Sequence, residues 1–279
     1  KILFSIIKNN NLYNLLIESL KKSKNFKKVI IRDKFFYKKI IKNKKYDLII
    51  NCDSTNEISK KYFFKKIIKN YDSTAYVTTL IHRKMENKGA SQIFSKYGPI
   101  AFLPISENET SVVFSIKNRS VNNNYDLSQS EFEKLIFQSN IKYHIKSIRN
   151  FEKFKLKSKN LRYYYNQNIL AFGEMLHQIH PLSGQGFNMT LRDIKVLIDL
   201  LRAKDSLGLP VDVSICKEFE DKTKHLNFLF SSGNDFIYEF FNYDNEYLKL
   251  FSKKIFNYLD NNVLFKKLAI KYADKGIIV

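Results

Sequence analysis

The feature that most limits the fold is a glycine-bearing loop between an apolar strand and an amphipathic helix. The run Ile169-Leu170-Ala171-Phe172 predicts a buried strand, and apolar residues recur at helical steps from Phe187 onward. The loop between them holds three of the chain's eight glycines, Gly173, Gly184 and Gly186. Glycine permits positive φ and close approach of a ligand to the backbone. A loop that leads directly into a helix also points free backbone N–H groups at its ligand. The pattern therefore indicates a site for the negatively charged edge of a ligand. A turn that needs glycine for geometry alone is the alternative.

The middle of the chain has the pattern of an antiparallel sheet. β-branched and aromatic residues dominate Thr74–Ile81, and turn signals separate the runs that follow, which are Ser91–Phe94, Ile100–Ile105 and Thr110–Ile116. Ser128 with Glu131 has capping-box spacing and predicts the start of a helix. Residues 143–157 are then predicted to be extended.

The two ends of the chain have different patterns. Near the start we expect a helix over Asn11–Lys22 and a short strand at Val29–Ile31. The apolar run in Tyr46–Asp53 ends in a polar cluster, as a buried parallel strand does on entering a loop. After the break at Gly208, helical patterns run from Ser214 to Phe241 and from Asn245 to about Leu268.

The net charge of +21 raises the question of a nucleic-acid or membrane partner. The basic residues are mostly lysines scattered along the chain, without the arginine forks, zinc spacing or aromatic motifs of nucleic-acid readers. We therefore expect no nucleic-acid partner, and weak attraction to an anionic membrane surface stays open. The sequence contains no run of about 18 apolar residues without a charge, so it predicts no transmembrane helix. Cys52 and Cys216 lack CxxC spacing and are expected to be buried thiols in a reducing compartment.

Two histidines in the glycine-bearing loop could be read as metal ligands. His177 and His180 are three residues apart, and no third ligand lies nearby in the sequence. We therefore expect one imidazole to pack and the other to hydrogen-bond to backbone, with no metal bound.

The loop resembles the second FAD motif of the ubiquinone-biosynthesis hydroxylases, a branch of the p-hydroxybenzoate-hydroxylase-like flavin monooxygenases. That motif reads Gly-Asp-Ala-Ala-His-x-x-His-Pro-x-x-Gly-Gln-Gly-x-Asn-x-x-x-Arg-Asp. The matching residues are Gly173, His177, His180, Pro181, Gly184, Gln185, Gly186, Asn188, Arg192 and Asp193. Tyr97–Ile105 resembles a stretch of the family's substrate domain, and Asp47–Asp53 resembles the strand before its Asp-Gly motif.

The resemblance implies a role for several residues. Glu174 stands where the family's Asp contacts the ribityl chain of FAD, and Asp53 stands at the Asp implicated in handling the pyrophosphate and the nicotinamide cofactor. The isoalloxazine would meet Pro181, Gly184, Gln185, Gly186, Phe187 and Asn188, and Gly173 is a further expected cofactor-binding residue. The chain differs from the motif in having Glu174 for Asp, Ser54 for Gly and Lys60 for Arg, and a lysine cannot make the arginine's bidentate contact.

The fold expected from the resemblance is α/β (α+β), a partial FAD-binding Rossmann-like domain with an inserted antiparallel-sheet substrate domain and C-terminal helices. The expected parts are 1–70 (partial FAD-binding domain), 71–160 (substrate domain), 161–205 (returning FAD-binding unit) and 206–279 (helical region). No GxGxxG follows a strand, so we expect a fragment of a longer enzyme.

The expected activity is FAD- and NAD(P)H-dependent hydroxylation of an aromatic ring, with a polyprenyl phenol of ubiquinone biosynthesis as the substrate. The expected partners are that hydrophobic substrate and, as open alternatives, a membrane surface or a biosynthetic complex. The expected location is the cytoplasm, and peripheral attachment at the inner membrane face is an open alternative. A non-catalytic remnant that has lost FAD is the competing reading, and no side chain is assigned as a catalytic base.

Overall fold

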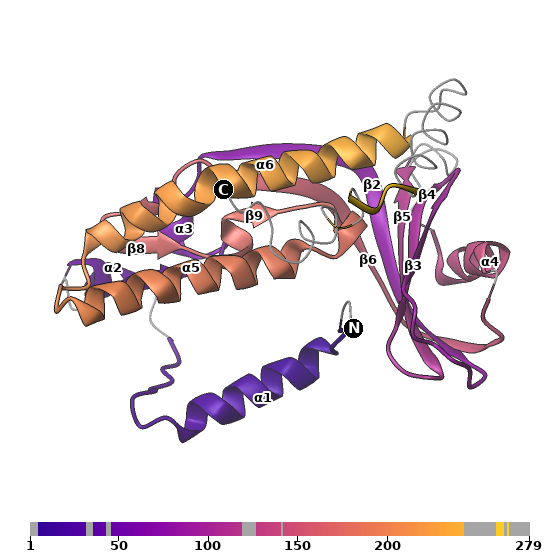
Figure 1. Cartoon of the computed structure of the whole chain (residues 1–279), viewed down its shortest axis with the longest axis horizontal. Coiled ribbons are helices and arrows are strands. Elements are labelled where there is room, and N and C mark those ends of the chain that lie inside the picture. Colours follow the sequence, from indigo (N-terminus) through magenta and orange to yellow (C-terminus); the bar gives the residue numbers. More distant parts are fainter. Residues whose placement is uncertain are drawn as a thin grey trace. The chain divides into compact units, whose positions relative to one another are not determined.

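A six-stranded sheet forms most of the predicted β structure (Figure 1). The computed structural model describes residues 5–31, 36–42, 46–118, 127–140, 142–242, 261–264 and 267. The strand order is β3-β4-β5-β2-β6-β9. The strands are β2 (Lys66–His82), β3 (Ser91–Ser95), β4 (Gly98–Pro104), β5 (Glu109–Lys117), β6 (Ile145–Leu161) and β9 (His177–Gln178). The pairs β3–β4, β4–β5, β5–β2 and β6–β9 are antiparallel, which confirms the predicted antiparallel sheet.

The chain divides into two units. Unit 1 contains residues 1–36 and 71–156, and unit 2 contains residues 37–70 and 157–279. The long strands β2 and β6 pass from one unit to the other, and each unit has its own hydrophobic core. Whether the four parts expected from the sequence are separate domains stays a prediction.

The core of unit 1 lies between its strands and helix α4 (Gln129–Ser139). The predicted capping box is present: the Ser128 N–H donates to Glu131 Oε2 (2.9 Å), and Ser128 Oγ accepts from the Glu131 N–H (3.4 Å). Phe132 is fully buried, and its ring stacks on that of Tyr76 at 5.3 Å. Phe114 packs in the same cluster. These aromatic side chains stabilise the fold of unit 1.

Gly98 begins β4 at a point where no side chain fits. Its φ is +136°, and a Cβ placed on it would lie 2.0 Å from the carbonyl oxygen of Ser115 on β5. Both the backbone conformation and the space therefore require glycine here.

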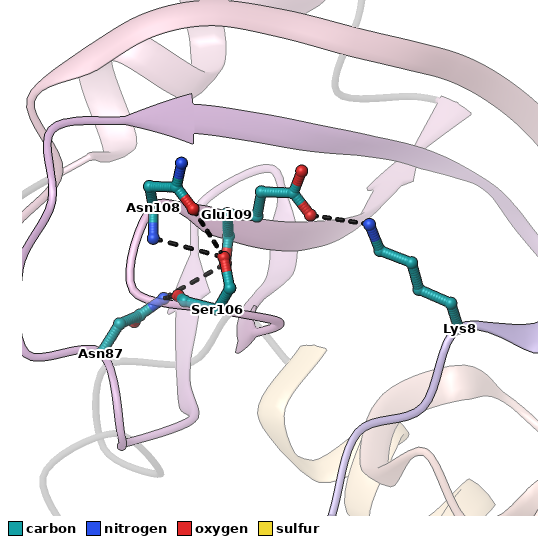
Figure 2. Close-up of polar contacts among 5 residues, drawn as sticks. All are labelled: Lys8, Asn87, Ser106, Asn108 and Glu109. Atoms are coloured by element: carbon teal, nitrogen blue, oxygen red, sulfur yellow. Dashed lines mark hydrogen bonds and ion pairs between the residues drawn. The ribbon is translucent and has the colours of Figure 1, made fainter. Parts of the chain in front are cut away.

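Side chains hold the turn between β4 and β5 (Figure 2). Asn87 Nδ2 donates to the Ser106 carbonyl (2.8 Å), and Ser106 Oγ donates to Asn108 Oδ1 (2.8 Å). Glu109 forms an ion pair with Lys8 at 2.7 Å, and Lys8 immediately precedes helix α1 (Asn9–Lys22). Residues more than 70 positions apart in the sequence thus meet at one turn.

A buried histidine lies beneath this turn, with both of its ring nitrogens hydrogen-bonded. His82 Nε2 is 2.9 Å from Thr110 Oγ1, and His82 Nδ1 is 2.8 Å from the Arg83 carbonyl. Asn87 Nδ2 also donates to Thr110 Oγ1 (2.9 Å), and the Tyr143 hydroxyl donates to Asn87 Oδ1 (3.3 Å). We call His82, Asn87, Thr110 and Tyr143 the His82 cluster.

The predicted N-terminal helix is confirmed as α1, but none of its residues is buried. The strand predicted at Val29–Ile31 is wrong: these residues have no regular structure, and Ile30 is 72% exposed. A strand needs a partner for its backbone groups, and no described strand pairs with this segment.

Unit 2 has a three-stranded sheet in the order β1-β8-β7. Its strands are β1 (Ile49–Asn51), β7 (Tyr165–Asn166) and β8 (Ile169–Ala171), and its helices are α2 (Phe36–Lys42), α3 (Glu57–Tyr62), α5 (Gly186–Ser206) and α6 (Val213–Asn242). β1 is parallel to β8, as predicted, although it is shorter than the predicted run.

The two long helices of unit 2 pack against each other (Figure 1). Leu197 and Leu200 of α5 and Ile215 and Phe219 of α6 are buried in one core with Leu170 of β8. The predicted α/β fold with C-terminal helices is therefore confirmed. The helix predicted beyond Asn245 lies outside the described residues apart from a few positions. Among the described helices, none is both long and apolar enough to cross a membrane.

Candidate functional site

The short parallel sheet of unit 2 brings two predicted site segments to one edge. Asn51 of β1 is the register partner of Ala171 of β8, and the Phe172 N–H donates to the Asn51 carbonyl (2.9 Å). Parallel strands end at the same edge, so Asp53 after β1 and the 3-10 turn η2 (Gly173–Met175) after β8 both follow this edge. In open α/β sheets, ligands bind at the carboxyl ends of the strands.

A buried polar network that sequence reasoning missed fixes the loop after β1. Asn51 is buried, its Nδ2 donates to Ser59 Oγ (2.8 Å), and its Oδ1 accepts from Asn56 Nδ2 (2.7 Å). Ser59 Oγ donates in turn to the Asp53 carbonyl. The signal in the sequence for this network is an asparagine at the end of an apolar strand.

The two predicted acidic site residues face solvent. Asp53 Oδ1 accepts from both the Thr55 hydroxyl and the Thr55 N–H, each at 2.7 Å. These hydrogen bonds lower the pKa of Asp53, first the side-chain bond and then the backbone bond. Glu174 is exposed in η2. Both carboxylates are therefore accessible to ligand groups at the edge of the sheet.

The glycines of the loop adopt positive φ and have open space beside them. Gly184 follows the 3-10 turn η3 (Pro181–Ser183) with φ +61°, and its N–H donates to the Pro181 carbonyl (3.3 Å). Gly173 has φ +65°. A Cβ placed on either residue would meet no described atom within 4 Å. Turn geometry accounts for the positive φ values, and the space beside both glycines would let a ligand approach the backbone.

Helix α5 begins at the end of this loop with no side-chain cap. Gln185 occupies the N-cap position without making a capping bond, and no acidic residue lies in the first turn. The amide of Asn188 instead donates to Gln185 Oε1 (3.2 Å). The N–H groups of the first turn have no acceptor within a helix, so those of Gly186, Phe187 and Asn188 are available to a ligand. Phe187 is 57% exposed beside them.

The two loop histidines are held by side chains of unit 2. His177 Nε2 is 2.7 Å from Asp193 Oδ2, and both side chains are at most 2% exposed. His180 is fully buried with its ring 4.1 Å from that of Tyr238, and burial lowers the pKa of His180 to about 3. The expected packing histidine is thus His180, whereas the partner of His177 is a carboxylate and not the expected backbone group. The described residues contain no group of three potential metal ligands.

Comparison with known sequences identifies relatives of this chain. Ubiquinone hydroxylase UbiL of Rhodospirillum rubrum is 27% identical over 178 residues, which cover 62% of this chain and 41% of that protein. The 3-demethoxyubiquinol 3-hydroxylase of Escherichia coli is 27% identical over 186 residues, which cover 65% of this chain and 47% of that protein. The chain therefore spans less than half the length of these two relatives.

Solved structures and family comparison agree with these relatives. The p-nitrophenol 4-monooxygenase of Pseudomonas putida matches with a TM-score of 0.71 and 11% identity, covering 97% of this chain and 73% of that one. The anhydrotetracycline hydroxylase OxyS of Streptomyces rimosus matches with a TM-score of 0.58 and 12% identity, covering 81% and 46%. At these identities the likeness shows a shared fold. The sequence model of the squalene epoxidase family matches residues 45–272, and the chain therefore belongs to this family of FAD-dependent monooxygenases.

Proposed function

We propose that this chain carries the flavin-ring site of an FAD- and NAD(P)H-dependent monooxygenase that hydroxylates an aromatic ring. The observation that carries the proposal is the uncapped start of α5 beside the open face of Gly184. We propose a polyprenyl phenol of ubiquinone biosynthesis as the substrate, because the two relatives are by name a ubiquinone hydroxylase and a demethoxyubiquinol hydroxylase.

The donor set fits the edge of a flavin. The pyrimidine edge of the isoalloxazine carries carbonyl oxygens and ring nitrogens that accept hydrogen bonds, and it gains negative charge when the flavin is reduced. Three N–H groups at the positive end of a 21-residue helix are suited to such an edge. The space beside Gly184 and Gly173 allows the ligand to approach the backbone closely.

When bound, FAD reduced by NAD(P)H would supply the oxygen-activating chemistry. The chain's own residues would bind and orient the cofactor. The N–H groups of Gly186–Asn188 would stabilise negative charge without reorganising, and Glu174 would accept a hydrogen bond from a ribityl hydroxyl. Pro181 would offer a rigid surface with no N–H of its own. We propose that Asp53 orients groups of the pyrophosphate or of the nicotinamide cofactor at the same sheet edge.

The competing proposal is a non-catalytic remnant that keeps the fold without FAD. We favour the flavin site because the uncapped helix start and the open glycines lie in one loop, whose residues match the FAD motif quoted above. We also propose that the chain works in the cytoplasm at the inner membrane face, because a net charge of +21 favours contact with anionic lipid or a biosynthetic partner.

A pair of matched glycine variants tests the flavin site. Gly184→Ala and Gly208→Ala carry the same backbone strain, because φ is +61° at Gly184 and +65° at Gly208, and a Cβ meets nothing within 4 Å at either position. Each variant should lose about 1 kcal/mol of stability. Only Gly184→Ala places its methyl group at the proposed site, and we expect its FAD dissociation constant to rise about ten-fold or more.

The measurement is FAD titration of the purified chain by flavin fluorescence, followed by assay of NAD(P)H oxidation with a prenylated phenol under oxygen. Equal FAD affinity in the two glycine variants would contradict the placement of the ring at Gly184. A chain that shows no affinity for FAD would favour the remnant.

A further inference from the structure

One buried carboxylate joins three elements of unit 2. Asp193 of α5 is 2% exposed, and its Oδ2 accepts from His177 Nε2 of β9 at 2.7 Å. Its Oδ1 accepts from Asn227 Nδ2 of α6 at 3.1 Å. A buried carboxylate is costly unless its oxygens are hydrogen-bonded, so these contacts fix the three elements relative to one another. We call Asp193, His177 and Asn227 the Asp193 cluster.

The second ring nitrogen of His177 is buried without a partner among the described residues. His177 Nε2 must carry the proton that it donates to Asp193, so in the neutral ring Nδ1 is an acceptor. Asn160 of β6 is the register partner of His177, so both side chains lie on one face of the sheet. Asn160 Oδ1 and His177 Nδ1 are buried atoms with no hydrogen-bond partner among the described residues.

The His177–Asp193 contact closes the segment that contains the proposed flavin turn. His177 precedes η3, Gly184 and the start of α5, and Asp193 lies within α5, 16 residues along the chain. The hydrogen bond therefore ties the residue at which the turn begins to the helix at which the turn ends. The first part of the turn is held by α6, where His180 is buried against Tyr238 and its carbonyl accepts from Asn234, whereas at its end Gly184 has no described atom beside it and α5 has no side-chain cap.

We propose that the Asp193 cluster is a positioning device, which holds the turn against α5 so that the N–H groups of Gly186–Asn188 keep their direction before a ligand binds. The inference rests on the proposed function, because only a bound flavin would use that direction. The residues of the cluster act through the backbone of the turn and touch no reacting atom.

The test compares two substitutions of one residue. His177→Phe removes the donor to Asp193 at similar volume, whereas His177→Gln keeps an amide N–H that can donate. In the FAD-free chain, we expect His177→Phe to speed amide hydrogen exchange in the turn about ten-fold, at the hydrogen-bonded N–H groups of Gly184 and Met189. We also expect the FAD dissociation constant to rise about ten-fold, and His177→Gln to restore most of both values.

Two further variants complete the experiment. Asp199→Asn changes an exposed carboxylate on the same helix and should leave both measurements within about two-fold. If His177→Phe does not fold, Asp193→Asn provides the same comparison, because it weakens the acceptor for both donors. Equal exchange in His177→Phe and His177→Gln, or a rise that is uniform along α5, would overturn the proposal. A chain that binds no FAD would contradict the proposed function, and the exchange measurement would still decide whether the cluster holds the turn.

Discussion

Units 1 and 2 contain the same three structural devices: a glycine with positive φ, a buried histidine and a helix start. At Gly98, His82 and the start of α4 in unit 1, the protein itself satisfies each of them. Gly98 faces the Ser115 carbonyl, both ring nitrogens of His82 are hydrogen-bonded, and Ser128 caps α4.

At Gly184, His177 and the start of α5 in unit 2, the corresponding groups are left open. A Cβ on Gly184 would meet no described atom within 4 Å, His177 has a buried ring nitrogen without a described partner, and α5 begins without a side-chain cap. All three lie in or beside one loop. The contrast holds for these six positions and is no rule for the whole chain, because α1 also begins without a side-chain cap and a Cβ on Gly208 also meets no described atom within 4 Å. What distinguishes the unit 2 positions is that all three belong to the proposed ligand site.

Gly98→Ala should produce the largest loss of stability. A Cβ there would meet the Ser115 carbonyl at 2.0 Å, and φ is +136°. Strain and overpacking together should cost about 3 kcal/mol or more, measured by urea unfolding. The matched control is Gly89→Ala, because a Cβ on Gly89 meets nothing within 4 Å. A cost for Gly98→Ala no greater than that of Gly184→Ala would remove the distinction between closed and open glycines.

Acid should destabilise unit 2 through His180. The pKa of this residue is about 3 in the folded chain because of burial, and about 6.5 when unfolded. Between these values the unfolded state binds a proton that the folded state does not. The free energy of unfolding therefore has its full value above pH 6.5 and falls as the pH is lowered. At pH 5 the loss should be about 2 kcal/mol. Urea unfolding of His180→Phe at pH 7 and pH 5 should show this difference removed; an unchanged difference would mean that other groups cause it.

Local patterns predicted the loop and its helix, because glycines and helical periodicity act over a few residues. Gly184 and the start of α5 lie where the sequence placed them. Asp193 and Asn227 could not be paired with His177 from the sequence, because they lie on separate elements that only the fold brings together. The strand at Val29–Ile31 failed for the same reason, since strand formation depends on a distant partner.

The His82 cluster allows the opposite kind of test, on a network that is closed. Thr110→Val removes the hydroxyl that contacts both His82 Nε2 and Asn87 Nδ2, leaving two buried polar atoms short of a partner. We expect a loss of about 1 to 2 kcal/mol by urea unfolding, with unchanged FAD affinity. Thr79→Val, at a half-buried position on β2 outside the cluster, is the control. If Thr110→Val weakened FAD binding as much as His177→Phe, the His82 cluster and the Asp193 cluster would not differ in their effect on FAD affinity.

The smallest effect concerns the two helix starts. Ser128→Ala removes the cap of α4 and makes its first turn resemble that of α5, which should cost about 1 kcal/mol. Ser130→Ala, whose hydroxyl lies 3.2 Å from Ser128 Oγ but caps no backbone N–H, should cost less. The loss at Ser128 estimates the stabilisation that α5 lacks in the FAD-free chain. If an acceptor atom of the ligand takes the place of the missing cap, FAD acts on α5 and not on α4. FAD should then raise the midpoint of thermal unfolding by the same amount in the Ser128→Ala chain and in the parent chain. A smaller rise in the variant would show that the start of α5 is coupled to the start of α4.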